Sequence, residues 1–519
     1  MRPLPCLRAW RLLALLLSFV LWCGLSPAMA EEITLRILHL NDFHGFAEPY
    51  KPLGSEELLG GMTYVATRVK VLRQEKPSLL LAAGDMIQGD NWANLFQSRS
   101  VIELMNAMKF DAMVLGNHEF DFGQAVLKKR LGEARFPVLA ANVQGVKGVK
   151  PYIIKKVKGL KVAVIGLSTP DTAVSTHPRN VVGLKFLSPE ETLTKYLQEL
   201  KGRADIIILL THLGYAEDRE LAAKFPSVAL IVGGHSHTKL LQPTVIGQTV
   251  VVQAWEHAKA LGVIDLTIKD GKVVKADGRL EDIKPVAGAE DAPTLKIVKK
   301  YQARVDAVLN EKIGAALVDL DAEKARIAET RLGNLIADII RARAGADAAI
   351  INGGGVRTSI NKGEITRKQV YAVLPFDNYI VAIRLSGRQL KETLEHGVSA
   401  RETYAGRFPQ VSGLTFTYNP AALPGSRIRE VTVGGQPLDL DKTYTVATND
   451  FLAAGGDGFT AFGEAIRAGK DFAVTGGMLK SARLVFNDPG TWIRDVVIDY
   501  IKAKKEVTAE LEGRIKEAL

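Results

Sequence analysis

Short apolar runs alternate with longer amphipathic segments through the first half of this chain. Strand-like runs occupy residues 35–40, 79–83, 112–115, 138–141, 161–166, 206–210, 228–232 and 249–252. The segments 58–75 and 91–108 carry the apolar spacing of amphipathic helices, and a hairpin is predicted at 261–275. Strands that alternate with helices in this way are typical of a layered domain, so the predicted fold class is α/β.

Five of the strand-like runs are followed by side chains of the types that bind metal ions. These are Asp42 and His44, then Asp85, Asn117, His212, and finally His235 and His237. Asp and Asn are ordinary turn residues, but the same kind of placement after five strands is hard to explain by turns alone. In open α/β sheets this edge is where ligands bind. Imidazole and carboxylate together suit Zn, Mn, Fe or Co, and the donors suffice for two ions.

The spacing suggests how two ions would be shared. Asp42 and His44 are expected to hold the first ion, and His237 could complete its set. Asp85 is the natural bridge, because a carboxylate can contact both ions of a dinuclear site. The second ion would then take the remaining donors, Asn117, His212 and His235.

His118 and Asp121 lie near this site but are not assigned as metal ligands. An imidazole oriented by a carboxylate would stabilise charge on a phosphoryl group or protonate a leaving oxygen. The alternative for His118 is that it is another metal ligand. Glu119 is expected to lie behind the ligands or in solvent. His39 is predicted to be a core residue, and surface or packing positions are predicted for His177, His257 and His396.

A second domain is predicted after the proline-bounded stretch 285–293 and a charged helix at 294–311. Eight of the nine histidines precede it, so metal chemistry belongs to the first domain. A helix is predicted to open within 326–335, and a strand at 348–351 leads into a glycine-rich turn that ends at Arg357. Such a turn lets backbone amides approach a polar ligand, and arginine adds a fork-shaped donor.

The first thirty residues have the features of a cleaved secretory signal peptide. Three arginines precede an apolar stretch at 12–25, and Ala28-Met29-Ala30 matches a cleavage site. An uncleaved anchor is the alternative, but the stretch is shorter than the ~20 residues of a spanning helix. Both cysteines lie in this leader, so the mature chain has no thiol chemistry. A periplasmic or secreted protein without a stable membrane anchor is expected.

Removing the leader's three arginines lowers the formal net charge from +10 to +7. A moderate basic excess suits anionic substrates. Basic residues alternate with acidic ones, and no basic run carries interleaved aromatic residues, so a nucleic-acid polymer is not expected as a partner.

The motifs of the first domain resemble those of the calcineurin-like metallophosphoesterases. They are Asp42-x-His44, Gly84-Asp85, Gly116-Asn117-His118-Glu119, His212 and Gly234-His235-Ser236-His237. The second domain extends the resemblance to the secreted bacterial 5′-nucleotidase/UDP-sugar hydrolase family. This resemblance implies an N-terminal four-layer α/β/β/α metallophosphoesterase domain (31–288), a connecting helix (289–312) and a smaller α/β substrate-binding domain (313–519). It also implies two divalent metal ions, Zn, Mn or similar.

The resemblance further implies roles for single residues. The metal positions are those given above, and His118 and Asp121 form the catalytic pair. The family usually has Gln or Asn where this chain has His237. The substrate-binding positions correspond to Arg326, Asn352, Arg357, Phe376, Asn378, Phe451 and Asp457. Gly413 also falls at a binding position, and Thr330 replaces a third arginine.

The two phenylalanines, Phe376 and Phe451, correspond to those that sandwich a nucleobase, and Asp457 to the residue that binds ribose. Stacking tolerates different bases, so broad nucleotide specificity is expected. Family members rotate their C-terminal domain between open and closed forms, and here the hinge would lie within 294–335.

The expected function is therefore that of an exported dinuclear-metal phosphohydrolase. It would release phosphate from nucleoside 5′-phosphates by attack of a metal-bridging hydroxide, with a nucleotide as substrate. The alternatives on the same scaffold are a 2′,3′-cyclic nucleotide phosphodiesterase/3′-nucleotidase, a UDP-sugar hydrolase and a sulfur-oxidation hydrolase. The phenylalanine pair argues against a sulfur substrate. A non-catalytic nucleotide-binding protein is disfavoured by the intact His118 and Asp121.

Overall fold

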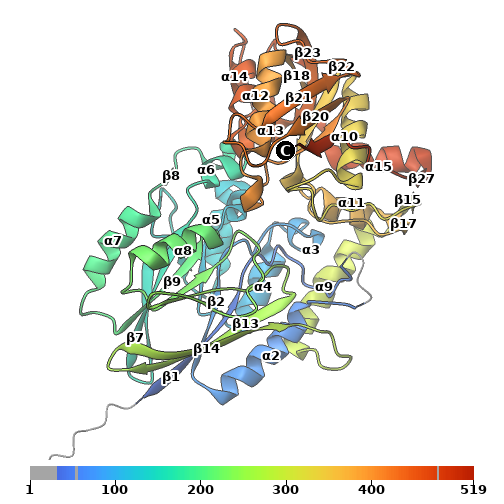
Figure 1. Ribbon diagram of the computed structural model, residues 1–519. Coiled ribbons are helices and arrows are strands. Elements are labelled where there is room, and N and C mark those ends of the chain that lie inside the picture. Colours follow the sequence, from blue (N-terminus) through green and yellow to red (C-terminus); the bar gives the residue numbers. More distant parts are fainter. Residues whose placement is uncertain (1–31, 53–56, 476–477, 519) are drawn as a thin grey trace, which may run out of the picture.

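The computed structural model describes residues 32–52, 57–475 and 478–518. The predicted signal peptide lies outside these residues. Two α/β domains are joined by the long helix α9 (Ala292–Leu309), which begins beside the N-terminal domain and leads toward the C-terminal one (Figure 1). Within the described ranges, no helix combines the length and the apolarity needed to cross a membrane.

Two six-stranded sheets form the N-terminal domain, with strand orders β14-β13-β1-β2-β3-β4 and β11-β12-β10-β9-β7-β6. The first contains β14 (Lys272–Asp282), β13 (Ala260–Lys269), β1 (Ile33–Leu40), β2 (Ser78–Ala82), β3 (Ala112–Val114) and β4 (Val138–Leu139). The second contains β11 (Thr244–Ile246), β12 (Thr249–Gln253), β10 (Leu230–Gly233), β9 (Ile206–His212), β7 (Leu160–Ser168) and β6 (Tyr152–Val157). Strands β1 to β4 are parallel, and so are β7, β9, β10 and β12, which brings their carboxyl ends to one edge. A short ribbon pairs β5 (Val143–Gln144) with β8 (Lys185–Phe186).

Side-chain alternation along β1 shows how the layers form. Leu35 and Ile37 pack between the two sheets, against residues such as Val164 of β7. Leu38 and Leu40 face the other way and pack against helices. This confirms the predicted four-layer α/β/β/α arrangement, with a buried core on each side of both sheets.

Different helices cover the outer faces of the two sheets. Those on the first sheet are α2 (Met62–Glu75), α4 (Arg99–Met108), α5 (Gly123–Glu133) and the connecting α9. Those on the second are α7 (Pro189–Leu200) and α8 (Tyr215–Lys224). The short helices α3 (Asn91–Asn94) and α6 (Thr172–Ser175) lie toward the C-terminal domain in Figure 1.

The C-terminal domain is built on a five-stranded sheet with the order β19-β16-β23-β18-β26. Its strands are β19 (Pro409–Ser412), β16 (Ala348–Asn352), β23 (Thr443–Asn449), β18 (Tyr379–Ser386) and β26 (Leu484–Trp492). Helices α10 (Arg331–Ala344), α11 (Arg367–Val373) and α15 (Ile493–Lys504) pack on one face, and α12 (Gly387–Val398), α13 (Asp450–Ala453) and α14 (Thr460–Arg467) on the other.

Three smaller sheets complete this domain. They contain β15 (Lys312–Ala316), β17 (Gly363–Thr366) and β27 (Glu506–Val507); β20 (Leu414–Tyr418), β21 (Ile428–Val433), β22 (Gln436–Pro437) and β28 (Ile515–Glu517); and β24 (Ala473–Thr475) with β25 (Met478–Lys480). Together with the five-stranded sheet they confirm the predicted α/β character of the second domain.

The prediction of one helix over 91–108 is wrong. The chain forms α3 and α4 with a break between them, because Gln97 and Ser98 adopt left-handed backbone angles (φ 44° and 66°). The helix predicted at 58–75 begins only at Met62, after two glycines with positive φ. Residues 95–97, which follow α3 in this break, line a cavity between the domains.

The helix predicted to open within 326–335 does so. Helix α10 begins at Arg331, and the Thr330 hydroxyl caps it by accepting a hydrogen bond from the Gly333 amide at 3.1 Å. Arg326 therefore lies in the loop before the helix.

Candidate active site

The donors predicted from the five strand ends lie together at one edge of the N-terminal domain. Asp42, Asp85 and Asn117 follow β1, β2 and β3, whereas His212 is the last residue of β9 and His235 follows β10. Five of the seven predicted metal-binding residues have left-handed backbone angles, with φ between 48° and 79°; they are Asp42, His44, Asp85, His235 and His237. Such conformations are costly for residues other than glycine and cluster at functional sites.

The donors form two groups, called metal-type groups below. Within each group the potential ligand atoms lie within 4.8 Å of one another. The first contains Asp42, His44 and His237. In it, His237 Nε2 lies 3.3 Å from both His44 Nε2 and Asp42 Oδ1.

The second group contains Asp85, His212 and His235. Asn117 joins it, since its Oδ1 lies 3.3 Å from His212 Nε2 and 3.1 Å from His235 Nδ1. Asp85 Oδ2 is 3.1 Å from His212 Nε2 and 3.9 Å from His44 Nε2, so this carboxylate lies between the two groups.

Hydrogen bonds fix the orientation of three of these imidazoles. His44 Nδ1 donates to the Gln88 carbonyl at 2.8 Å, and His212 Nδ1 donates to the Ala83 carbonyl at 2.7 Å. His237 Nδ1 donates to the carboxylate of Glu256. In each case Nε2 is left facing the group, which is the arrangement typical of metal-binding histidines.

The charges of the site favour cations. Burial opposes ionisation of Asp85, but His212 and His118 hold the pKa of this carboxyl well below its usual range. Burial also opposes charge on His212, yet Asp85 and Asp42 raise its pKa to about 10. Burial holds the pKa of His44 well below its usual value and lowers that of His235 to about 3. The site therefore combines charged carboxylates with imidazoles, of which His44 and His235 are neutral, and this donor set fits two divalent ions.

Glu119 does not lie in solvent, which corrects one of the two positions expected for it. Its carboxylate is buried and accepts hydrogen bonds from the amides of Gly116, Asp85, Met86 and Ile87, at 2.5 to 3.3 Å. It thereby holds the backbone of two ligand-bearing loops together.

His118 and Asp121 form a hydrogen-bonded pair. His118 Nδ1 lies 2.6 Å from Asp121 Oδ2, and the Thr176 hydroxyl donates to Asp121 Oδ1 at 2.6 Å. His118 Nε2 is 4.0 Å from Asp85 Oδ2. Among the described residues, His118 belongs to neither metal-type group.

The metal-type groups border a cavity of about 380 Å³ between the two domains. Both His118 and Asp121 line it, together with Asp85, Asn117, His235 and His237. All seven predicted substrate-binding residues line the same cavity: Arg326, Asn352, Arg357, Phe376, Asn378, Phe451 and Asp457. Residues more than 300 positions apart in the sequence therefore meet in one site.

Contacts across the cavity are close. Arg357 Nη2 donates to His44 Nε2 at 3.2 Å, so a cationic group already faces this imidazole lone pair. Burial and the nearby Arg326 lower the pKa of Arg357 to about 10. The ring of Phe376 lies nearly parallel to that of His118, with centroids 5.7 Å apart.

Polar residues of the C-terminal domain are connected to one another. Asn352 Nδ2 donates to Asp457 Oδ2 at 2.8 Å, and Asn449 Nδ2 donates to Asn352 Oδ1 at 3.1 Å. Gly413, in contrast, does not line the cavity but forms the turn between β19 and β20, with φ 72°. Thr330 is buried as the cap of α10.

The remaining histidines lie mostly as predicted. His39 is buried in the core, His257 stacks on Phe46 with centroids 3.9 Å apart, and His396 Nε2 donates to the Asp457 carbonyl at 2.8 Å. His177 differs, because it lines the cavity and places Nε2 3.4 Å from Asp450 Oδ2.

Several residues of the site were not found from the sequence. Thr176, Arg179 and Asn180 line the cavity from the segment after α6, which contains a 3-10 helix at Pro178–Val181. Glu256 contacts His237. Glu256 lies three residues after the end of β12, so a carboxylate close to a strand end was its only signal.

Comparisons with known proteins agree with this architecture. Residues 35–239 match the family model of calcineurin-like phosphoesterases, and residues 310–464 match that of the 5′-nucleotidase C-terminal domain. The chain is 32% identical to snake venom 5′-nucleotidase of Crotalus adamanteus, over 97% of this chain and 92% of that protein. It is 34% identical to the trifunctional nucleotide phosphoesterase protein YfkN of Bacillus subtilis, covering 93% of this chain but only 35% of that longer protein.

A solved structure extends the similarity to three dimensions. The 5′-nucleotidase precursor from Thermus thermophilus is 37% identical and superposes with a TM-score of 0.84, over 93% of this chain and 99% of that one. The comparisons thus match both domains and their order. The chain belongs to the 5′-nucleotidase family of metal-dependent phosphoesterases.

Proposed function

We propose that this protein is an exported 5′-nucleotidase that hydrolyses nucleoside 5′-phosphates in the cavity between its two domains. One observation carries the proposal. A single cavity joins two metal-type donor groups of the N-terminal domain to the aromatic, arginine and carboxylate side chains of the C-terminal domain. The names of the relatives in snake venom and in Thermus thermophilus support the same substrate class.

Asp42, His44 and His237 are proposed to hold one divalent ion. Asn117, His212 and His235 are proposed to hold the other, with Asp85 shared between them. Ions bound there would make a water molecule acidic enough to attack phosphorus at neutral pH and would offset negative charge on the phosphoryl oxygens.

His118 is proposed to act on the oxygen that leaves phosphorus. Its Nδ1 is held by Asp121, which in turn accepts a hydrogen bond from Thr176, so the ring has one fixed orientation. Nε2 is then the position from which a proton can be delivered to the leaving oxygen or a hydrogen bond donated to a phosphoryl oxygen.

The C-terminal residues are proposed to position the nucleotide. Arg357 and Arg326 would donate to phosphate oxygens, because the guanidinium fork matches their geometry. Phe376 and Phe451 would stack on the base, and Asp457, oriented by Asn352, would accept hydrogen bonds from ribose hydroxyls. Base stacking supplies affinity with little discrimination between bases.

The wider assignments from the sequence are proposed as well. The N-terminal leader supports export to the periplasm or beyond. Helix α9, at Ala292–Leu309, supports a connecting helix at 289–312 between the domains 31–288 and 313–519. Cleavage of 2′,3′-cyclic nucleotides, 3′-nucleotides or UDP-sugars is the second candidate. The Bacillus subtilis relative, a trifunctional nucleotide phosphoesterase, supports more than one nucleotide substrate on this scaffold.

Phosphate release by residues 31–519 tests the proposal. The substrates would be AMP, ATP, UDP-glucose, 2′,3′-cyclic AMP and an aryl phosphate, each with Mn²⁺, Zn²⁺ or EDTA, and an added phosphatase would reveal phosphodiester products. We expect rapid cleavage of AMP that EDTA abolishes. Cleavage of the aryl phosphate alone would contradict a nucleotide substrate while leaving the metal chemistry in place.

A further inference from the structure

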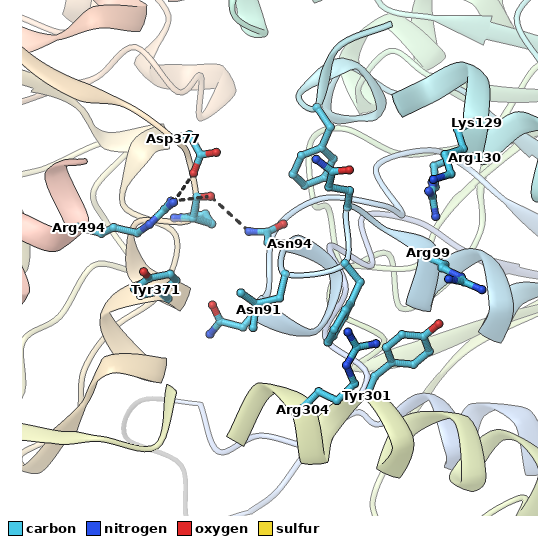
Figure 2. A pocket seen from close by; sticks show the side chains of 15 residues that line it. Asn91, Asn94, Arg99, Lys129, Arg130, Tyr301, Arg304, Tyr371, Asp377 and Arg494 are labelled. Carbon is cyan, nitrogen blue, oxygen red and sulfur yellow. Dashed lines mark hydrogen bonds and ion pairs between the residues drawn. The ribbon is translucent and has the colours of Figure 1, made fainter. Parts of the chain in front are cut away.

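A second cavity, of about 530 Å³, lies between the domains beside the catalytic one (Figure 2). The two cavities share four lining residues, Gln97, Phe122, Pro375 and Asp377. The chain break between α3 and α4 lines the second cavity, together with α3, α4, α5 and α9 of one domain and the C-terminal domain opposite.

Basic side chains dominate the lining of this cavity. Five cations and one carboxylate face it: Arg99, Lys129, Arg130, Arg304, Arg494 and Asp377. Figure 2 shows Lys129, Arg130, Arg99 and Arg304 on the side of the N-terminal domain, opposite Arg494. Like charges gathered in this way repel one another unless an anion lies between them.

Some of these charges are already paired, and the pairing is incomplete. Arg494 binds Asp377, and Arg130 Nη1 lies 2.8 Å from Glu133 Oε2. Arg304 lies over the ring of Phe96, at 4.6 Å from its centroid.

Arg130 is buried with too few hydrogen-bond partners among the described residues. Its side chain is only 4% exposed, yet its Nε has no hydrogen-bond partner among the described residues. The Nε of Arg494, which is 10% exposed, has none there either. Leaving a buried donor unpaired is costly. An anion with several oxygen atoms would find accessible donors beside these two arginines, in the exposed side chains of Arg99, Lys129 and Arg304.

We propose that this cavity is a second anion site, which binds the phosphate group of a small molecule away from the two metal-type groups. Fork-shaped guanidinium donors on α4, α5 and α9 match phosphate oxygens. The source of the group is either free phosphate or an intact nucleotide. The shared lining residues favour free phosphate, because phosphate produced in the catalytic cavity would be released next to the second cavity. This preference rests on the proposed function, but the existence of the anion site does not.

Binding of inorganic phosphate to the metal-depleted protein, residues 31–519, tests this without turnover. The variant combines Lys129→Glu on α5 with Arg304→Glu on α9, two exposed residues of the lining. The matched control combines Lys128→Glu with Lys296→Glu, which are exposed on the same two helices but do not line the cavity. Both double variants change the net charge equally, so long-range electrostatic effects cancel.

We expect the wild type and the control to bind phosphate alike, and the Lys129→Glu/Arg304→Glu variant to bind it at least about tenfold more weakly. Equal binding by all three proteins, which the catalytic cavity alone would give, would overturn the proposal. A parallel titration with AMP identifies the source. If the wild type binds AMP and phosphate with equal affinity, the site recognises the phosphate group alone. If it binds AMP more tightly and the Lys129→Glu/Arg304→Glu variant loses this difference, the ligand is a nucleotide.

Discussion

Replacing Glu119 by Gln should destabilise the N-terminal domain, although the two side chains have the same shape. Glu119 Oε1 accepts from the amides of Met86 and Ile87 at 2.8 and 3.3 Å, and Oε2 accepts from those of Asp85 and Gly116 at 2.9 and 2.5 Å. Glutamine has only one carbonyl oxygen. Whichever way its amide turns, two buried backbone donors would face an NH₂ group.

The structure gives the size of the effect. The amide nitrogen should take the Oε1 position, because the 3.3 Å bond there is the weakest of the four. Each unsatisfied buried donor costs about 1–3 kcal/mol, and neighbouring losses are not additive, so we expect about 2–4 kcal/mol in the free energy of unfolding. That is a large part of the ~5–15 kcal/mol that stabilises an ordinary domain.

Urea unfolding of residues 31–519 in a Trp492→Phe background isolates this domain. The remaining tryptophans, Trp92 and Trp255, both lie in the N-terminal domain, so their fluorescence reports its unfolding alone. EDTA keeps metal binding from shifting the transition. With m-values of a few kcal/mol per molar urea, the midpoint should fall by about 1 M.

Glu220→Gln is the matched control, since it makes the same change on the exposed side of α8. Its effect should stay within about 0.5 kcal/mol. If Glu119→Gln and Glu220→Gln unfold at the same urea concentration, the four hydrogen bonds do not hold the ligand loops as described.

Three further predictions concern the site itself. His118→Ala should lower turnover of AMP about 10²–10⁴-fold while metal content, measured by mass spectrometry, stays that of the wild type; loss of metal would instead make His118 a ligand. Glu256→Gln should weaken metal binding about 10–100-fold in a chelator competition, because the carboxylate orients His237; unchanged affinity would show that this hydrogen bond is dispensable. Phe376→Ala should remove ~1–3 kcal/mol of stacking energy and so raise KM for AMP about five- to 150-fold, while KM for an aryl phosphate changes less. Equal changes in both KM values would exclude base stacking.

The position of the donor groups could be read from the sequence because it depends on local pattern. An apolar run followed by Asp, Asn or His places a polar side chain after a buried strand, whatever the rest of the chain does. Parallel strands then bring those positions to one edge of each sheet. Asp42, Asp85 and His235 were identified in this way, and the structure brings them together.

Other features depend on packing that local pattern does not record. The break between α3 and α4 comes from left-handed angles at Gln97 and Ser98, two residues with no special preference for them. It is held by tertiary contacts, such as the hydrogen bond from the buried Ser98 hydroxyl to the Ile87 carbonyl.

By itself the sequence determined the fold class and the chemistry of the donors, because strand burial and side-chain type are properties of short segments. Only the tertiary structure decided which partners those donors have. Glu256 reaches His237 from another loop of the N-terminal domain. Arg357 reaches His44 from 313 positions away, because the two domains meet at one edge. Such meetings are fixed by the packing of whole layers, and short segments carry no record of it.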